Sequence, residues 1–165
     1  NYRDAAQRGQ QELVFEPDVT LSPWYFDETK LRLALANLVD NALVHTGQGT
    51  RITVRTGHIT VEDQEQAILE VQDTGPGISA EDMPHILTRF YRAEKHRPTR
   101  GGAGVGLSIT RKIVEGHEGV VEVHSEPGQG SIFRILLPFS TERDHADGRG
   151  PARGHERDDS VVAGD

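Results

Sequence analysis

Three polar side chains recur at four-residue intervals early in the chain. Asn37, Asn41 and His45 stand at positions i, i+4 and i+8, so they share one edge if this segment is a helix. Asparagine is a middling helix former because its amide competes for backbone hydrogen bonds. Amide oxygens are hard ligands of the kind that Mg²⁺ takes together with water and substrate phosphates. The spacing therefore indicates a magnesium site, and a solvated polar helix face is the alternative.

A second group of residues able to do chemistry runs from Asp73 through Gly75 to Gly77, after an alternating apolar stretch. A carboxylate at the end of a strand can accept the exocyclic amine of adenine, and glycines let the backbone approach a purine closely. An ordinary turn that begins at an aspartate has the same residues. By itself this pattern does not separate an adenine site from such a turn.

Glycines at Gly102, Gly104 and Gly106 open a predicted helix. Backbone N–H groups and the helix dipole at a helix N-terminus favour a phosphate group. No strand precedes these glycines, so they are not the dinucleotide-binding turn of a Rossmann unit. No Lys-Ser/Thr follows them, so they are not a Walker loop either. The run indicates a phosphate site of some other kind.

A basic segment lies between the last two groups. Residues 89–100 hold five cations and one acid, although the whole chain has a net charge of −8. A basic loop in an acidic protein fits one small anionic ligand, and a merely solvated charged loop is the alternative. The overall charge argues against general nucleic-acid binding, which needs a basic surface.

The elements that must position these groups follow from capping residues and hydrophobic spacing. Asp27 is the predicted N-cap of a helix that runs to about His45 and buries Leu31, Leu35, Leu38 and Ala42. Further helices are predicted from Ser79 to Leu87 and from Val105 to His117. Strands are predicted over residues 13–16, 19–21, 51–58, 67–71, 120–124 and 132–137.

Composition limits the domain organisation. A chain of 165 residues suits one hydrophobic core, and the absence of cysteine excludes disulfides and thiolate metal sites. Its apolar runs are far shorter than the roughly 20 residues of a membrane span. Residues 1–11 are too polar for a core, so we expect them to be a linker and residues 12–139 to form the folded domain. Residues 140–165 have too little apolar surface to fold, so we expect a disordered tail.

Taken in order, these motifs resemble the ATPase domain shared by sensor histidine kinases, type II topoisomerases, the ninety-kilodalton heat-shock chaperones and MutL. The resemblance covers residues 27–138. It consists of an Asn box at 37–41, glycine boxes at 73–77 and 102–107, a Phe box at 89–92, and Gly128-x-Gly130-Ser131 before the last strand. It implies a two-layer α/β sandwich, with a mixed, mostly antiparallel sheet and three helices on one face. ATP would lie between the Asn-box helix and a lid over about residues 92–104.

The branch within this family depends on Asn37. Members that hydrolyse ATP, and the anti-sigma serine kinases, carry a glutamate there as general base, and an amide cannot accept that proton. The chain therefore resembles the catalytic domain of a bacterial two-component sensor histidine kinase. Asn41 would bind Mg²⁺ with help from Asn37, and Asn37 and Arg92 would be catalytic. The implied nucleotide-binding residues are Asn41, His45, Asp73, Gly75, Gly77, Arg89, Gly102, Gly104, Val105, Gly106, Leu107 and Ser131.

Two positions depart from the family pattern. Many relatives have Lys or Arg where this chain has Val44, so Arg89, Arg92 or another lid cation would contact more of the phosphate. His45 stands where relatives often stack Tyr or Phe on the purine. An imidazole can stack with less area, and a simple histidine at a helix end is the alternative.

The resemblance implies a protein histidine kinase that passes the γ-phosphoryl of Mg–ATP to a separate dimerisation domain, for relay to a response regulator. The alternatives are an anti-sigma-type serine kinase and a non-catalytic nucleotide-gated module. His85 and His117 fall in predicted helices of the domain and His155 in the tail, so the acceptor histidine is expected outside this sequence. The resemblance also implies that residues 1–11 are a linker from an upstream dimerisation domain. We further expect a monomeric fragment of a homodimeric parent, and a cytoplasmic domain of a membrane-anchored receptor that binds no nucleic acid.

Overall fold

The computed structural model describes residues 1–18, 26–61, 63–91 and 104–139. Within these residues the chain forms three helices and five strands. In order, they are α1 (Tyr2–Arg8), β1 (Glu12–Glu16), α2 (Glu28–His45), β2 (Arg51–Val61), β3 (Gln64–Asp73), α3 (Gly106–Glu115), β4 (Val120–Glu126) and β5 (Gly130–Pro138). The predicted strand at 19–21 and the predicted tail at 140–165 lie outside the described residues.

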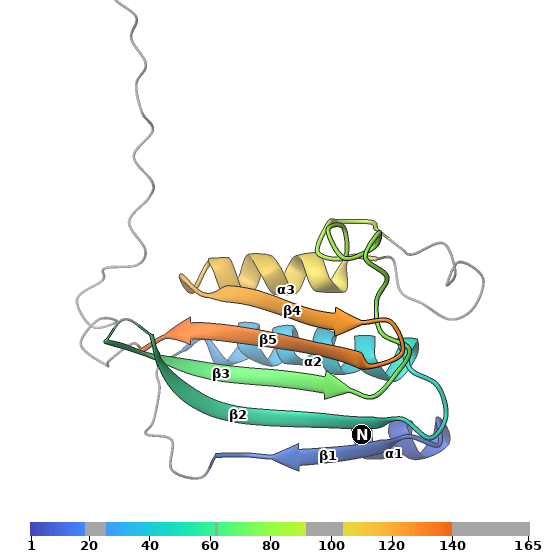
Figure 1. Ribbon diagram of the computed structural model, residues 1–165. Coiled ribbons are helices and arrows are strands. Elements are labelled where there is room, and N and C mark those ends of the chain that lie inside the picture. The colour runs from blue at the N-terminus through green and yellow to red at the C-terminus, as the bar shows by residue number, and fades with distance from the viewer. Residues whose placement is uncertain (19–25, 62, 92–103, 140–165) are drawn as a thin grey trace, which may run out of the picture.

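The five strands form one sheet in the order β1-β2-β3-β5-β4. β1 runs parallel to β2, and every other pairing is antiparallel. Helices α2 and α3 pack against one face of this sheet, as Figure 1 shows. The expected two-layer sandwich with a mixed, mostly antiparallel sheet is therefore confirmed.

Helix α2 forms for the reasons that its sequence suggests. The side chain of Asp27 caps it by accepting a hydrogen bond from the Lys30 amide at 3.0 Å. Leu38 and Ala42 of the predicted stripe are at most 3% exposed, whereas Leu31 and Leu35 are only partly buried against the core. Ala34, which was not predicted, is fully buried. The partners of these helix residues in the core include fully buried side chains from three strands, Ile52, Val71, Ile135 and Leu137.

The third helix is not where the sequence predicted it. Residues 79–87 form a run of turns, and the helix count is completed by α1 at the N-terminus. Pro84 explains the difference, because proline lacks the amide hydrogen that a helix interior needs and its ring clashes with the preceding turn. The side chain of Ser79 still accepts a hydrogen bond from the Asp82 amide, as in a helix cap.

Residues 1–11 pack onto the domain. Asn1 caps α1, and Ala6 is 2% exposed. Gln11 then donates from Nε2 to the Leu43 carbonyl, the Thr46 carbonyl and the Thr46 hydroxyl, which fastens this segment to the end of α2. A connection from α1 to an upstream dimerisation domain stays a prediction.

The pairing of β3 with β5 brings distant residues to one end of the sheet. Asp73, the last residue of β3, is the register partner of Ser131, and Ser131 is the partner of Ser125 on β4. Gly130 has φ of +87°, and a Cβ there would lie 2.0 Å from the carbonyl oxygen of Asp73. Only glycine fits this close crossing, so the hairpin turn sits directly against the end of β3.

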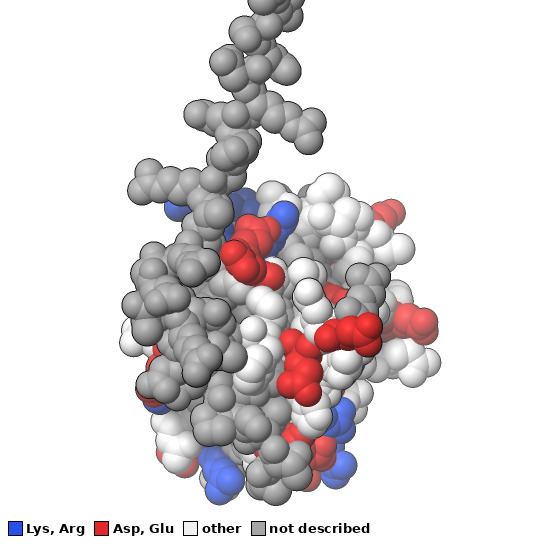
Figure 2. Space-filling view, turned by 90° about the vertical axis from the view of Figure 1, so that its left-hand side faces the viewer, with Lys and Arg blue, Asp and Glu red and all other residues white. Residues whose placement is uncertain are grey.

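Two surface properties bear on function. On the described part of the side shown in Figure 2, acidic and basic side chains are interspersed and no continuous basic surface occurs. None of the helices in the described ranges is both long and apolar enough to cross a membrane.

Candidate functional site

The buried carboxylate of Asp73 is the centre of the first half of the site. Its residue is 6% exposed, and Oδ1 accepts a hydrogen bond from the Gly75 amide at 2.8 Å. Burial raises the pKa of this carboxyl, while hydrogen bonds from Gly75 and from the backbone and side chain of Ser131 lower it. The carboxylate is thus held in one orientation at a strand end, as an adenine acceptor must be.

The loop after Asp73 is docked on the β4–β5 hairpin. Gly77 has φ of +70°, and a Cβ there would lie 2.1 Å from the carbonyl oxygen of Glu126. The Gly128 amide donates to the Pro76 carbonyl at 2.7 Å, and the Ile78 amide donates to the Ser125 hydroxyl at 2.9 Å. Glycine at position 77 is required both by the backbone conformation and by this contact.

The same loop also touches the end of α2. A Cβ on Gly75 would lie 2.6 Å from Cγ2 of Thr46, the residue that follows His45. The first glycine box and the C-terminal end of the Asn-box helix are therefore in contact, although about 30 residues separate them in sequence. This contact brings Asp73, Gly75 and Gly77 to the end of α2 on which His45 is exposed.

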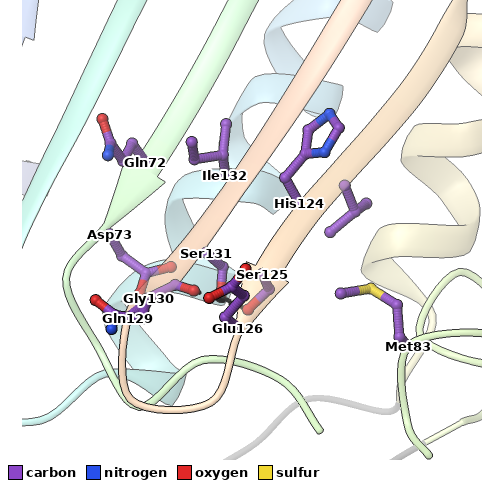
Figure 3. A pocket seen from close by; sticks show the side chains of 11 residues that line it. Gln72, Asp73, Met83, His124, Ser125, Glu126, Gln129, Gly130, Ser131 and Ile132 are labelled. Atoms are coloured by element: carbon purple, nitrogen blue, oxygen red, sulfur yellow. Dashed lines mark hydrogen bonds between the residues drawn. The ribbon is translucent and has the colours of Figure 1, made fainter. Parts of the chain in front are cut away.

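A cavity of about 400 Å³ opens beside Asp73 (Figure 3). Its volume lies within the roughly 300–1,000 Å³ of small-ligand sites. Both carboxylates in its lining, Asp73 and Glu126, would repel phosphate, so it suits an uncharged base better. Side chains of α2 are not part of its lining. The described lining residues are Gln72, Asp73, Met83, Val123, His124, Ser125, Glu126, Gln129, Gly130, Ser131 and Ile132.

The Asn box meets the second glycine box through Asn37. Its Nδ2 donates to the Gly106 carbonyl at 3.1 Å and approaches the Thr110 hydroxyl at 3.4 Å. The fully buried Thr110 in turn donates to the Ala34 carbonyl at 3.3 Å. The amide nitrogen of Asn37 thus fastens α2 to α3, and its Oδ1 is the atom that these bonds leave to a ligand. Asn41, one turn further along α2, is half-buried.

The start of α3 has features of an anion site. Val105 occupies the N-cap position and makes no side-chain cap hydrogen bond. Gly104 precedes it with φ of +68°. A Cβ on Gly106 would come no closer than 3.6 Å to Asn37, so no steric contact requires glycine at this position. The missing side chain leaves space at the start of the helix. The first-turn amides of this ten-residue helix receive no side-chain cap from Val105, and amides at a helix N-terminus favour an anion. Leu107 packs on the core and holds this end in place.

Arg89 is brought to the same end of α3 by its neighbour. The Phe90 amide donates to the Gly104 carbonyl at 2.9 Å, and the Arg89 guanidinium lies 4.7 Å from the centre of the Phe90 ring. The exposed Arg89 therefore stands beside the residue that precedes the N-cap of α3. Arg92 and Gly102, the remaining predicted site residues, lie outside the described residues.

The residues thus fall into a base-sized cavity at Asp73 and an anion-favouring helix start at Gly106, linked by α2. A family model, Histidine kinase-, DNA gyrase B-, and HSP90-like ATPase, matches residues 26–141. The chain belongs to this ATPase family.

Relatives within the family are sensor histidine kinases. SenX3 of Mycobacterium tuberculosis, a sensor-like histidine kinase, is 37% identical over 126 residues, which cover 74% of this chain and 29% of SenX3. The mycobacterial sensor histidine kinase MprB is similar in structure, with a TM-score of 0.67 and 27% identity over 83% of this chain and 90% of that chain. Full-length ShkA, solved in complex with AMPPNP, has a TM-score of 0.72 and 27% identity over 84% of this chain and 27% of its own. The expected resemblance to histidine kinase catalytic domains is confirmed.

The donor set of this ATPase-family site fits Mg–ATP. Asn37 and Asn41 supply amide oxygens, and Asp73 supplies a buried acceptor. The part of the chain that the structure describes has no group of three or more His, Cys, Asp or Glu that could hold a metal by itself. A magnesium ion here would therefore need oxygen ligands from phosphate and water.

Sequence reasoning missed two site neighbours. The Ser125 hydroxyl accepts a hydrogen bond from the Ile78 amide, donates one to the Gly130 carbonyl and lies 3.1 Å from the Ser131 hydroxyl. It therefore connects the loop after β3 to the β4–β5 hairpin next to Asp73. Thr46 contacts Gly75 and ends α2 by donating to the Ala42 carbonyl. The alternation of β4 could have indicated that Ser125 faces the helices, but its partner loop is visible only in the fold.

Proposed function

We propose that this chain is the catalytic, ATP-binding part of a sensor histidine kinase. It binds Mg–ATP and passes the γ-phosphoryl group to a histidine on a separate dimerisation domain, for relay to a response regulator. The observation that carries the proposal is the buried Asp73 carboxylate, which lines a cavity of about 400 Å³. Helix α2 contacts the loop after Asp73 through Thr46 and the uncapped start of α3 through Asn37. This arrangement has an acceptor for a base at one end and an anion site at the other.

Asp73 selects the base in this proposal. Its carboxylate accepts the exocyclic amine of adenine, and the Gly75 amide and Ser131 hold it in position. Guanine has a carbonyl oxygen in that place, which would leave the buried carboxylate unpaired and repelled at a cost of about 1–3 kcal/mol or more. His45, exposed at the end of α2, would stack on the purine.

The phosphates are held at the other end. The first-turn amides of α3 and the Arg89 guanidinium supply positive potential, and the oxygens of Asn41 and Asn37 bind Mg²⁺. Magnesium, when bound, neutralises charge on the transferring phosphoryl group. Because Gly106 and Thr110 engage the Nδ2 of Asn37, the direction of its Oδ1 is set before the ligand arrives.

Asn37 also favours transfer to an imidazole over hydrolysis. An amide does not accept a proton at neutral pH, so the site has no general base at this position to activate water or a serine hydroxyl. An imidazole nitrogen needs no such base to attack phosphorus. This argument favours the histidine kinase over an anti-sigma-type serine kinase. The proposal extends to a homodimeric, membrane-anchored parent with this domain on the cytoplasmic side.

Phosphotransfer between separate proteins tests the proposal. The chain is mixed with radiolabelled Mg–ATP and with the histidine-bearing dimerisation domain of the same parent. We expect acid-labile label on that domain and none when its acceptor histidine is replaced by glutamine. Acid-stable label on serine would favour the serine kinase. ATP binding without label on any protein would favour a non-catalytic nucleotide-gated module.

A further inference from the structure

One carboxylate outside the nucleotide contacts joins the two ends of the turn segment 79–91. Asp82 accepts a hydrogen bond from the Tyr91 hydroxyl on Oδ1 and one from the Ser79 hydroxyl on Oδ2, both at 2.6 Å. The His85 ring lies 5.3 Å from the Tyr91 ring, centre to centre. All three oxygen-bearing side chains are half-buried. Hydroxyl donors to a charged carboxylate at this length form strong, directional bonds.

The residue beside this carboxylate contact has an unusual backbone. Phe90 has φ of +64°, a left-handed conformation that a bulky residue rarely adopts, and its side chain is 65% exposed. Such a conformation persists only where neighbouring contacts enforce it. On one side the Phe90 amide is bonded to the Gly104 carbonyl, and on the other Tyr91 is bonded to Asp82.

Arg89 directly precedes the strained residue, Phe90. The Arg89 guanidinium lies over the Phe90 ring at 4.7 Å, and the Phe90 backbone is bonded to Gly104 just before α3. The segment from Ser79 to Tyr91 has turns instead of a regular helix. Six backbone hydrogen bonds are made by its residues, and one of them, from Phe90 to Gly104, reaches another segment. The side-chain bonds of Asp82 add a direct link between the two ends of the segment.

We propose that Asp82 and Tyr91 are positioning residues, whose hydrogen bond holds Phe90 and thereby presents Arg89 to the nucleotide phosphates. This inference rests on the proposed function, because it takes the phosphates to lie at the start of α3. Asp82 and Tyr91 do not touch the ligand. They act only through the direction of the Arg89 side chain.

A double-mutant cycle tests this coupling. The whole chain and its Tyr91→Phe, Arg89→Ala and doubly substituted variants are titrated with Mg–ATP and, by competition, with adenosine, which has no phosphate. We expect Tyr91→Phe to weaken ATP binding about tenfold, as for loss of one hydrogen bond to a charged group. Adenosine affinity should change less than about twofold, because Asp73 and the base cavity are untouched.

The double variant decides between positioning and packing. If Tyr91 acts through Arg89, then Tyr91→Phe should weaken ATP binding by less than about twofold once Arg89 is alanine. Additive losses, or equal losses for ATP and adenosine, would overturn the inference and indicate a general disturbance of the fold. Unchanged ATP affinity in Tyr91→Phe would overturn it as well.

Two controls keep the test interpretable. Tyr2→Phe removes the hydroxyl of another tyrosine that lies beside a carboxylate, Asp40, and should leave ATP affinity unchanged. Should Tyr91→Phe unfold at the titration temperature, Asp82→Ala provides the second variant with the same expected pattern. Failure of the unsubstituted chain to bind ATP would overturn the proposed function itself. That result is distinguishable from normal ATP binding that Tyr91→Phe leaves unchanged, which would overturn only the inference about Asp82 and Tyr91.

Discussion

At the scale of single residues, Asp73 combines two opposing demands. Burial favours the neutral carboxyl and raises its pKa, while three hydrogen bonds from Gly75 and Ser131 favour the charged form. Adenine recognition needs the charged acceptor. The domain therefore keeps a carboxylate in a place that disfavours it, which is the usual sign of a functional group rather than a stabilising one.

The raised pKa of Asp73 predicts how the stability of the domain changes with pH. Its folded pKa lies above its unfolded value, so its contribution is fully present below the unfolded pKa, near 3.9, and is lost as pH rises through the folded pKa. Relative to Asp73→Asn, which mimics the neutral carboxyl, the unsubstituted chain should lose stability as pH rises from about 4 towards neutrality. Denaturant unfolding of both chains across this range measures the difference. A constant or opposite difference would contradict it.

Asn41 separates ligand binding from folding. Its side chain is half-buried on the edge of α2, so Asn41→Ala should keep the fold while weakening Mg–ATP binding by at least about tenfold through loss of a metal ligand. Calorimetry with and without Mg²⁺ measures the loss. Val44→Ala, at an exposed position of the same helix, is the matched control and should bind as the parent does. Normal Mg–ATP binding by Asn41→Ala would remove Asn41 from the site.

At the scale of elements, the loop after β3 is rigid because it is trapped between two neighbours. One side touches Thr46 at the end of α2, and the other is bonded to the β4–β5 hairpin through Pro76 and Ile78. A base-binding loop that is already docked loses little freedom when the ligand arrives. The site is in this respect prepared by packing between elements.

Gly77→Ala tests the docked loop. The φ of +70° and the 2.1 Å approach to the Glu126 carbonyl mean that an alanine must both strain the backbone and push the hairpin away. We expect the free energy of unfolding to fall by more than about 2 kcal/mol. Gly57→Ala, where a Cβ meets nothing within 4 Å, is the control and should change it by less than about 1 kcal/mol. Equal effects in urea unfolding would show that the loop is not held as described.

At the scale of the whole molecule, ligand binding should stabilise the domain without consuming the ligand. The site brings together residues from both layers of the sandwich, so Mg–ATP should bind only the folded chain. At a hundredfold excess over the dissociation constant, such binding adds about 2.7 kcal/mol. In the proposed site an amide, Asn37, takes the place of a general base, so we expect no steady hydrolysis to accompany this binding.

Thermal unfolding with nucleotides checks this expectation. Mg–ATP should raise the melting temperature by several degrees, and GTP at the same concentration should raise it much less, because in the proposed site Asp73 would discriminate the base. Phosphate release by the chain alone should stay at the level of ATP in buffer. Steady turnover, or an equal shift with GTP, would contradict the proposed site chemistry.

Local patterns decided much of this protein. The Asp27 cap, the apolar stripe of α2 and the alternation of β2 and β3 are read from neighbouring residues, because helix and strand periodicity are local properties. The order of the motifs along the chain also indicated the family. Asn37, Asp73 and Gly106 are recognised by residue type and sequence order, and neither requires knowledge of the fold. The prediction of a helix over residues 79–87 was wrong, although Pro84 in the sequence already disfavoured a helix there.

Only the tertiary structure decided which of these residues meet. Asn37 is bonded to Gly106 and Asp73 is paired with Ser131 across long loops, and no local pattern encodes such distances. The seven-residue helix α1 forms for the same reason, because a helix so short is unstable until packing on its neighbours stabilises it. The Tyr91–Asp82 bond likewise depends on a turn path that sequence periodicity does not predict. Contacts of this kind are set by packing of the whole chain, where burial strengthens a hydrogen bond and excludes alternative arrangements.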